Sequence, residues 1–157
     1  MKVEIERKFL AKSSAIDDAV CITCIVQGYL PGIGRIRIVS PGFINPIGYL
    51  TIKGKPSLSG MTRLEYEYEI PVEDAREMLE NLCEGYPVTK MRYAVPYFDH
   101  GWEVDVFTGR NAGLILAEIE LGSEDESFAY PPWLEAEVTK DPKYTNKNLS
   151  LHPFFRG

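Results

Sequence analysis

Strict alternation of charged and apolar residues is the feature that most constrains how this chain of 157 residues can fold. Near the start, Glu4, Glu6 and Lys8 fall at one parity of the numbering. Ile5 and Phe9 fall at the other. Successive side chains of a β-strand point to opposite faces, so the pattern predicts a strand with one ionic and one apolar face.

The same period of two recurs along most of the chain. It predicts eight strands, at about residues 2–10, 21–29, 34–39, 48–53, 62–70, 88–95, 101–107 and 114–121. Most of the connections are short and rich in Gly and Pro, which favours antiparallel pairing of neighbouring strands.

Helical spacing of apolar residues is clear in one segment only. It predicts an amphipathic helix over 72–84, beginning after Pro71 and ending near Gly85. A capping-box pattern at Ser123 and Glu126 is soon followed by two prolines, and residues 143–155 are expected to form at most a short terminal turn.

Composition and charge narrow the class of protein. The chain has 17 basic and 23 acidic residues and a formal charge of −6, so it is not expected to bind nucleic acid through bulk positive charge. No apolar stretch approaches the roughly 20 residues of a membrane helix, and no secretory signal segment is recognisable. We therefore expect a single domain over 1–157, in the cytoplasm and without a membrane partner.

The charged faces admit two interpretations. An open antiparallel sheet would leave them in solvent, whereas a closed barrel would turn them toward a lumen with room for one small ligand. We predict the second, a mainly β fold of the α+β class with an eight-stranded antiparallel barrel and a few flanking helices, because the signs of the charges sort by strand. The inward bases would be Lys8, Arg35, Arg37, Lys53, Arg63, Lys90 and Arg92. The inward acids would be Glu4, Glu6, Glu65, Glu67, Glu69, Glu103, Asp105, Glu118 and Glu120.

Such a lumen predicts a ligand that carries charge itself. An unpaired buried charge costs several kcal/mol, so the lumen must hold water or ions. Arginine and lysine suit phosphate oxygens, and clustered carboxylates suit Mg²⁺ or Mn²⁺. The pattern therefore predicts a site for a metal-complexed polyphosphate.

The order of these residues resembles a known family, the CYTH domains or triphosphate tunnel metalloenzymes. Residues 4–8 match its E-x-E-x-K signature, and the matches continue in order through Arg35-x-Arg37, Lys53, Glu65-x-Glu67, Lys90-x-Arg92, Asp105 and Glu118-x-Glu120. Residues 27–30 and 145–148 are similar to the short bacterial branch. The resemblance implies a barrel-shaped tunnel, commonly in a homodimer, that acts on triphosphates with Mg²⁺ or Mn²⁺.

The resemblance also implies roles for individual residues. The bases above would bind phosphate, and the metal ligands would be Glu4, Glu6, Glu118, Glu120 and Asp105. Lys90, Tyr29 and the tunnel carboxylate Glu67 would act on the reacting phosphate. Inorganic tripolyphosphate, cleaved to pyrophosphate and phosphate, is the expected substrate, because no residue cluster suggests a pocket for a base or a thiazole. Thiamine triphosphate, nucleoside triphosphates, ATP cyclisation and a non-catalytic polyphosphate-binding module are the alternatives.

Overall fold

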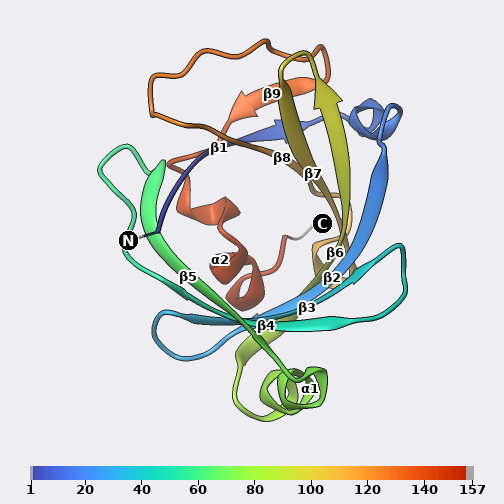
Figure 1. The fold of residues 1–157 in the computed structure, drawn as a ribbon, viewed down its shortest axis with the longest axis vertical. Helices are drawn as coiled ribbons and strands as arrows, with labels where there is room; N and C mark the ends of the chain where they lie inside the picture. Colours follow the sequence, from blue (N-terminus) through green and yellow to red (C-terminus); the bar gives the residue numbers. More distant parts are fainter. Residues whose placement is uncertain (1, 155–157) are drawn as a thin grey trace.

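A closed antiparallel β-barrel forms the body of the computed structural model, which describes residues 2–154 (Figure 1). The strands are β1 (Val3–Ala11), β2 (Cys21–Tyr29), β3 (Gly34–Pro41), β4 (Ile47–Lys53), β5 (Thr62–Ile70), β6 (Glu84–Tyr97), β7 (His100–Thr108), β8 (Ile115–Glu120) and β9 (Leu134–Glu137). Hydrogen bonding runs in the order β5-β4-β3-β2-β6-β7-β8-β1, and a β1–β5 pairing closes the ring. The predicted eight-stranded barrel is therefore confirmed.

Strand β1 takes part in three pairings because different parts of it meet different partners. Its first residues pair with β5, its middle pairs with β8, and its last residues pair with β9. The short strand β9 was not predicted, since four residues give too little alternation to recognise. The prediction also began β6 at residue 88, four residues later than its observed start at Glu84.

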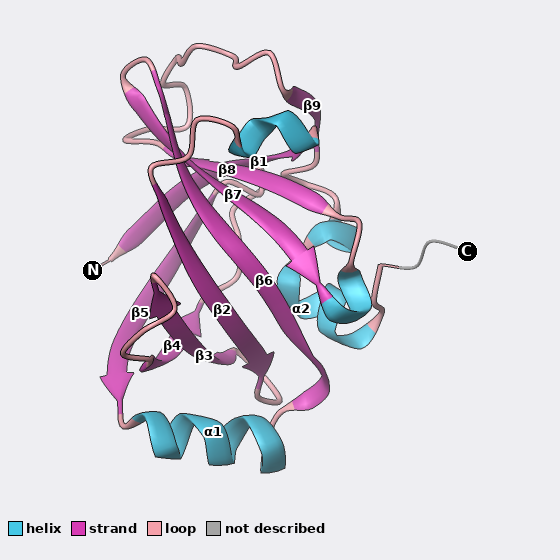
Figure 2. Ribbon diagram, turned by 90° about the vertical axis from the view of Figure 1, so that its right-hand side faces the viewer, coloured by secondary structure: helices cyan, strands magenta, loops and turns pink. Residues whose placement is uncertain are grey.

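The predicted amphipathic helix is α1 (Val72–Asn81), which lies outside the barrel (Figures 1 and 2). Glu73 and Asp74 occupy its first turn, where the positive end of the helix dipole favours carboxylates. Its buried Ala75 faces Gly48 so closely that a Cβ at Gly48 would lie 2.9 Å from the Ala75 Cβ. The missing side chain therefore lets helix and sheet approach each other. None of the helices in residues 2–154 has the length and apolarity that a membrane crossing requires.

A second helix, α2 (Asn146–Leu151), closes one end of the barrel. Viewed along the barrel it projects inside the ring of strands, and from the side it lies beside the ends of β6 and β7 (Figures 1 and 2). Leu149 of α2 belongs to a buried apolar cluster with Val88, Phe107 and Leu116. The barrel is thus filled by apolar side chains at this end. The short 3₁₀ segments are Ser13–Ile16, Gly109–Asn111 and Pro142–Tyr144.

The outer face of β1, β7 and β8 carries a larger apolar core. Phe9, Trp102 and Ile119 are almost fully buried there, with Trp133 and Phe128 of the segment before β9 packed against them. This segment does not extend the Ser123 capping box into a helix, and the chain runs through turns instead. The outer apolar face is therefore covered by α1 on one side and by the segment leading into β9 on the other.

Candidate active site

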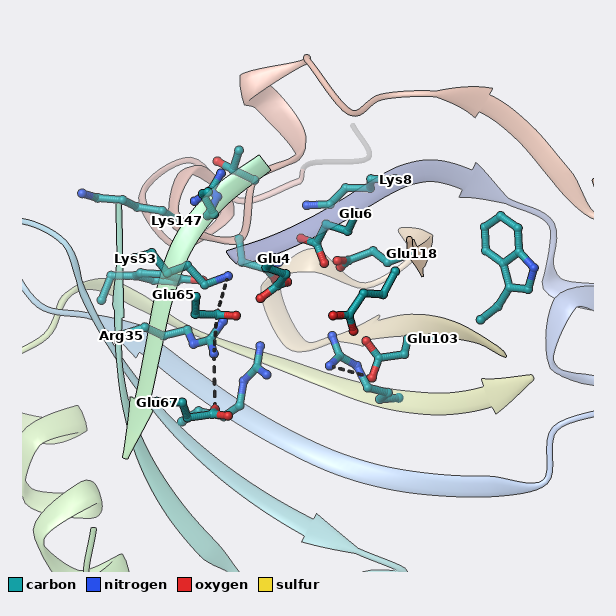
Figure 3. Close-up of a pocket in the computed structure, with 18 of the residues that line it drawn as sticks. Glu4, Glu6, Lys8, Arg35, Lys53, Glu65, Glu67, Glu103, Glu118 and Lys147 are labelled. Atoms are coloured by element: carbon teal, nitrogen blue, oxygen red, sulfur yellow. Dashed lines mark ion pairs between the residues drawn. The ribbon is translucent and has the colours of Figure 1, made fainter. Parts of the chain in front are cut away.

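A cavity of about 510 Å³ occupies the interior of the barrel, and charged side chains dominate its walls (Figure 3). The charged residues that line it are Glu4, Glu6, Lys8, Arg35, Arg37, Lys53, Arg63, Glu65, Glu67, Arg92, Glu103, Glu118, Glu120 and Lys147. Six of the seven predicted phosphate-binding bases are in this set, as are four of the five predicted metal ligands. The charged faces therefore point inward, and the interpretation as an open sheet is wrong.

Bases from β3 and β4 gather on one wall. Arg35 donates to the Thr51 hydroxyl at 3.1 Å and lies 3.8 Å from Glu67, while the Lys53 ammonium lies 3.3 Å from Glu65. The Nε of Arg35 is buried and has no hydrogen-bond partner among residues 2–154. A buried N–H without a partner is uncommon, and an anion that drew the Arg35 guanidinium toward the cavity would satisfy it.

Burial lowers the pKa values of these bases. Desolvation, together with the neighbouring Arg35, lowers the pKa of Lys53 to about 8. Desolvation, with Arg35 and Arg92 nearby, lowers the pKa of Arg37 to about 9. A polyanion in the cavity would favour the charged form of each base and so oppose both shifts.

Carboxylates from β1 and β8 gather on the opposite side. Strand pairing sets Glu6 beside Glu120 and Lys8 beside Glu118. Burial raises the pKa of Glu6 well above its usual value, and the charges of Glu118 and Glu4 raise it further. Glu118 behaves differently: burial opposes its ionisation, but Lys8 and Arg92 lower its pKa to about 2.

These carboxylates fit a hard divalent cation by their chemistry. Oxygen donors are what Mg²⁺ and Mn²⁺ prefer, and a bound cation would oppose the burial and the carboxylate repulsion that raise the pKa of Glu6. Glu4, Glu6 and Glu118 point toward one another in Figure 3. Within the described part of the chain, no three His, Cys, Asp or Glu side chains are placed so that they could already bind one metal ion together. Closure around an ion would therefore require side-chain movement.

Lys90 and Asp105 lie behind the cavity wall and do not line it. The Lys90 ammonium is 2.8 Å from one Asp105 oxygen and donates to Asn146 of α2 at 3.1 Å. Both oxygens of Asp105 also accept from Arg92, at 2.8 and 2.9 Å. Desolvation lowers the pKa of Lys90 to about 7, although Asp105 opposes the shift. In this arrangement Asp105 pairs with cations, and its role as a metal ligand stays a prediction.

Tyr29 and Glu67, the other two predicted catalytic residues, both line the cavity. The Tyr29 hydroxyl accepts a hydrogen bond from Gln27 at 2.9 Å, whereas Lys90 bonds to Asp105 and Asn146. The two residues expected to act together therefore have separate partners in this structure.

Sequence reasoning missed several polar residues of the site. Gln27 and Thr51 share the inward parity of Tyr29 and Lys53, so the alternation itself could have identified them. Thr145, Asn146 and Lys147 also line the cavity, but they come from the tail that was expected to form only a short turn. Lys147 donates to the Gly32 carbonyl at 2.7 Å and so links α2 to the β2–β3 turn.

Comparison with known proteins identifies relatives over nearly the whole chain. No family model matches. An inorganic triphosphatase of Acetivibrio thermocellus is 44% identical over 154 residues, which cover 98% of this chain and 97% of the relative. An inorganic triphosphatase of Nitrosomonas europaea is 38% identical, covering 94% of this chain and 97% of the relative.

Solved structures resemble the chain in the same way. The structure of the inorganic triphosphatase NE1496 superposes with a TM-score of 0.64 at 35% identity, covering 98% of this chain and 99% of that one. A putative adenylyl cyclase from Hippeastrum, described as having a dominant triphosphatase activity, gives a TM-score of 0.54 at 15% identity, with 78% of this chain and 80% of that one covered. The second likeness shows a shared fold only.

Proposed function

Because this chain belongs to the inorganic triphosphatase family and is thus a triphosphate-hydrolysing enzyme, we propose that it cleaves inorganic tripolyphosphate to pyrophosphate and phosphate with Mg²⁺ or Mn²⁺. The observation that supports this substrate most strongly is the cavity, in which bases on one side face carboxylates on the other. A linear polyanion needs the bases along its length, and the cation that accompanies it needs the carboxylates. The resemblance to the CYTH domains supports the same proposal.

The residues of the chain divide the work of hydrolysis. Arg35, Arg37, Lys53 and Arg92 hold the phosphate oxygens and neutralise the charge that develops as water attacks a terminal phosphorus and its bridging P–O bond breaks. Glu4, Glu6, Glu118 and Glu120 would hold the cation. When bound, the cation supplies electrostatic stabilisation of the phosphate oxygens. Glu67, which lines the cavity, is the group proposed to orient the attacking water and receive its proton. Lys90 would have to leave Asp105 to reach the reacting phosphate, so its catalytic role requires movement of that side chain.

Three further properties stay predictions of the same proposal. The protein is expected to be a homodimer, to form a single domain and to work in the cytoplasm. Thiamine triphosphate and nucleoside triphosphates are the alternative substrates, and ATP cyclisation is the alternative reaction. Phosphate release separates the substrates, and cyclisation of ATP would be recognised by release of pyrophosphate and cyclic nucleotide in place of phosphate.

Phosphate release from tripolyphosphate, thiamine triphosphate, ATP and pyrophosphate tests the proposal, each measured with Mg²⁺, Mn²⁺ or EDTA. We expect metal-dependent release from tripolyphosphate above all others. Glu120 is exposed, so E120Q should leave the melting temperature within about 2 °C while lowering kcat/KM by about 10²-fold or more. E77Q, on the exposed face of α1, is the matched control. Equal turnover by E120Q and E77Q, or release that EDTA does not reduce, would contradict the proposed role of the carboxylates.

A further inference from the structure

Gln27 is a fully buried amide between two residues of the cavity wall. It lies on β2 directly opposite Arg37 of β3 and two residues before Tyr29. Its Oε1 accepts from the Arg37 Nε at 2.8 Å, and its Nε2 donates to the Tyr29 hydroxyl oxygen at 2.9 Å. Arg37 and Tyr29 line the cavity, whereas Gln27 stands behind them.

The direction of both hydrogen bonds follows from the chemistry of Arg37. A guanidinium has only donors, so the amide oxygen of Gln27 must face Arg37. The amide nitrogen must then face Tyr29, and the Tyr29 oxygen must accept. Arg37 therefore fixes the orientation of the Gln27 amide, and the amide makes the Tyr29 hydroxyl oxygen the acceptor of their hydrogen bond.

The hydrogen of the Tyr29 hydroxyl is thereby left for another acceptor. Among residues 2–154 the Tyr29 hydroxyl donates no hydrogen bond, and the residue is 9% exposed at the cavity surface. Phosphate oxygens are acceptors, and a preorganised neutral donor stabilises negative charge that grows during phosphoryl transfer. The free side of the hydroxyl thus suits a phosphate oxygen.

We propose that Gln27 is a positioning residue that makes Tyr29 a hydrogen-bond donor to the bound polyphosphate, so that Tyr29 does not act as a base. The inference rests on the proposed triphosphatase function. It also explains why the position suits an amide. A carboxylate there would accept from both Arg37 and Tyr29, which would turn the Tyr29 proton away from the cavity and neutralise Arg37.

A double-mutant cycle between Gln27 and Tyr29 tests the proposal. We expect Q27E and Y29F each to lower kcat for tripolyphosphate with Mg²⁺ by about 10- to 100-fold. In the Y29F background, the factor by which Q27E lowers kcat should be less than about a third of the factor in the wild-type background. The reason is that the hydroxyl group misdirected by the new carboxylate is already absent. The effect of the new carboxylate on Arg37 is present in both backgrounds, so the cycle cancels it. Tyr93 packs on the outer apolar core, so Y93F is the matched control background. In that background Q27E should lower kcat by the same factor as in the wild-type protein.

Equal losses from Q27E in the wild-type and Y29F backgrounds would overturn the proposal, since Gln27 would then act through Arg37 or through folding alone. Thermal melting identifies unfolded variants, and Q27M, of similar shape but unable to donate, replaces Q27E in the cycle if Q27E does not fold. The same cycle is measured on the Kd for tripolyphosphate by calorimetry. A wild-type protein without turnover would refute the proposed function, and the binding cycle would still decide the role of Gln27.

Discussion

At the scale of single residues, some buried charges of the site are paired with opposite charges and others lie beside like charges. Arg92 and Lys90 share Asp105, whereas Glu6 is crowded by Glu4 and Glu118 and resists ionisation. The first arrangement stabilises the fold, and the second works against it until a cation arrives. Substitutions in the two groups should therefore change stability in opposite directions.

E6Q is expected to stabilise the metal-free protein while reducing catalysis. The folded-state pKa of Glu6 is raised, so its contribution to stability is present below its ordinary pKa of about 4.5 and is lost as pH rises toward the folded value. Removing the charge should raise the free energy of unfolding by about 1 kcal/mol at pH 8, or Tm by about 2–4 °C. Melting curves in EDTA at pH 4 and pH 8 check this. The gain should vanish at pH 4, and a loss of stability at pH 8 would contradict it.

D105N is expected to destabilise the protein. Arg92 and Lys90 hold the pKa of Asp105 well below its usual range against the effect of burial. Its stabilisation is therefore present above its ordinary pKa of about 4 and is lost as pH falls toward the folded value. Leaving the Arg92 guanidinium buried without its carboxylate partner, and Lys90 without the charge that favours its protonation, should cost about 3–5 kcal/mol at pH 7, and less at pH 3.

Urea unfolding at both pH values measures the cost of D105N. E103Q is the control, because Glu103 is half exposed and lies 3.4 Å from Arg92, so its loss should cost under about 1 kcal/mol. The double variant D105N/K90M should recover part of the loss, since it removes the buried amine that has lost its carboxylate partner. Equal unfolding free energies for D105N and E103Q would show that Asp105 does not hold the network together.

At the scale of elements, the two α-helices have different tasks. Helix α1 covers the outer face of the barrel, and α2 carries Asn146 and Lys147 into the cavity while Leu149 fills its end. The docking of α2 depends on Gly85 at the start of β6, which has φ +72°. A Cβ there would lie 2.5 Å from the Ser150 carbonyl oxygen.

G85A should therefore displace α2 from the barrel. The strained φ and the clash with Ser150 together should cost about 1–3 kcal/mol, and turnover of tripolyphosphate should fall as the α2 residues leave the cavity. Hydrogen exchange over residues 145–151, measured with Tm and kcat/KM, checks this prediction. G54A is the control, because a Cβ at Gly54 meets only ordinary contacts with Leu64. Unchanged exchange in G85A would mean that α2 docks independently of this glycine.

At the scale of the whole molecule, closure of the barrel converts an acidic chain into a binder of a polyanion. The net charge is −6, yet the bases are concentrated on one wall of an enclosed cavity. Enclosure from water is also what lowers the pKa values of Lys53, Arg37 and Lys90. Binding and protonation are thus coupled by the architecture.

Tripolyphosphate binding should take up protons near pH 8. A bound polyanion raises the lowered pKa values of Lys53 and Lys90, so affinity should be highest below those values and fall as pH rises through them. Calorimetry at pH 8 in buffers of different ionisation enthalpy measures the uptake. K53M should reduce it, and K55M, at an exposed position outside the cavity, should not. Titration of the substrate itself is common to all variants, so identical uptake in K53M and K55M would contradict the coupling.

The barrel and most of its inward charges could be predicted from the sequence because they follow from local geometry. Parity along a strand decides which side chains share a face, so Glu4, Glu6, Lys8, Arg35 and Lys53 were placed correctly relative to their apolar neighbours. The same rule marks the helix after Pro71. Its end at Asn81 was earlier than predicted, because the Leu82 and Cys83 amides turn back to the Met78 carbonyl and the chain enters β6 at Glu84.

Only the tertiary structure decided how deep each residue lies and which distant segments complete the site. Lys90 shares the inward parity of Arg92, but Asp105 and Asn146, 15 and 56 residues away in the chain, hold it behind the wall. Strand β9 forms because β1 offers it a free edge, and α2 docks because the apolar end of the barrel accepts Leu149. Periodicity is a property of neighbours in sequence. The depth of Lys90 behind the wall, the docking of α2 and the pairing of β9 with β1 depend on contacts between segments far apart in the chain. These contacts exist only once the chain has folded.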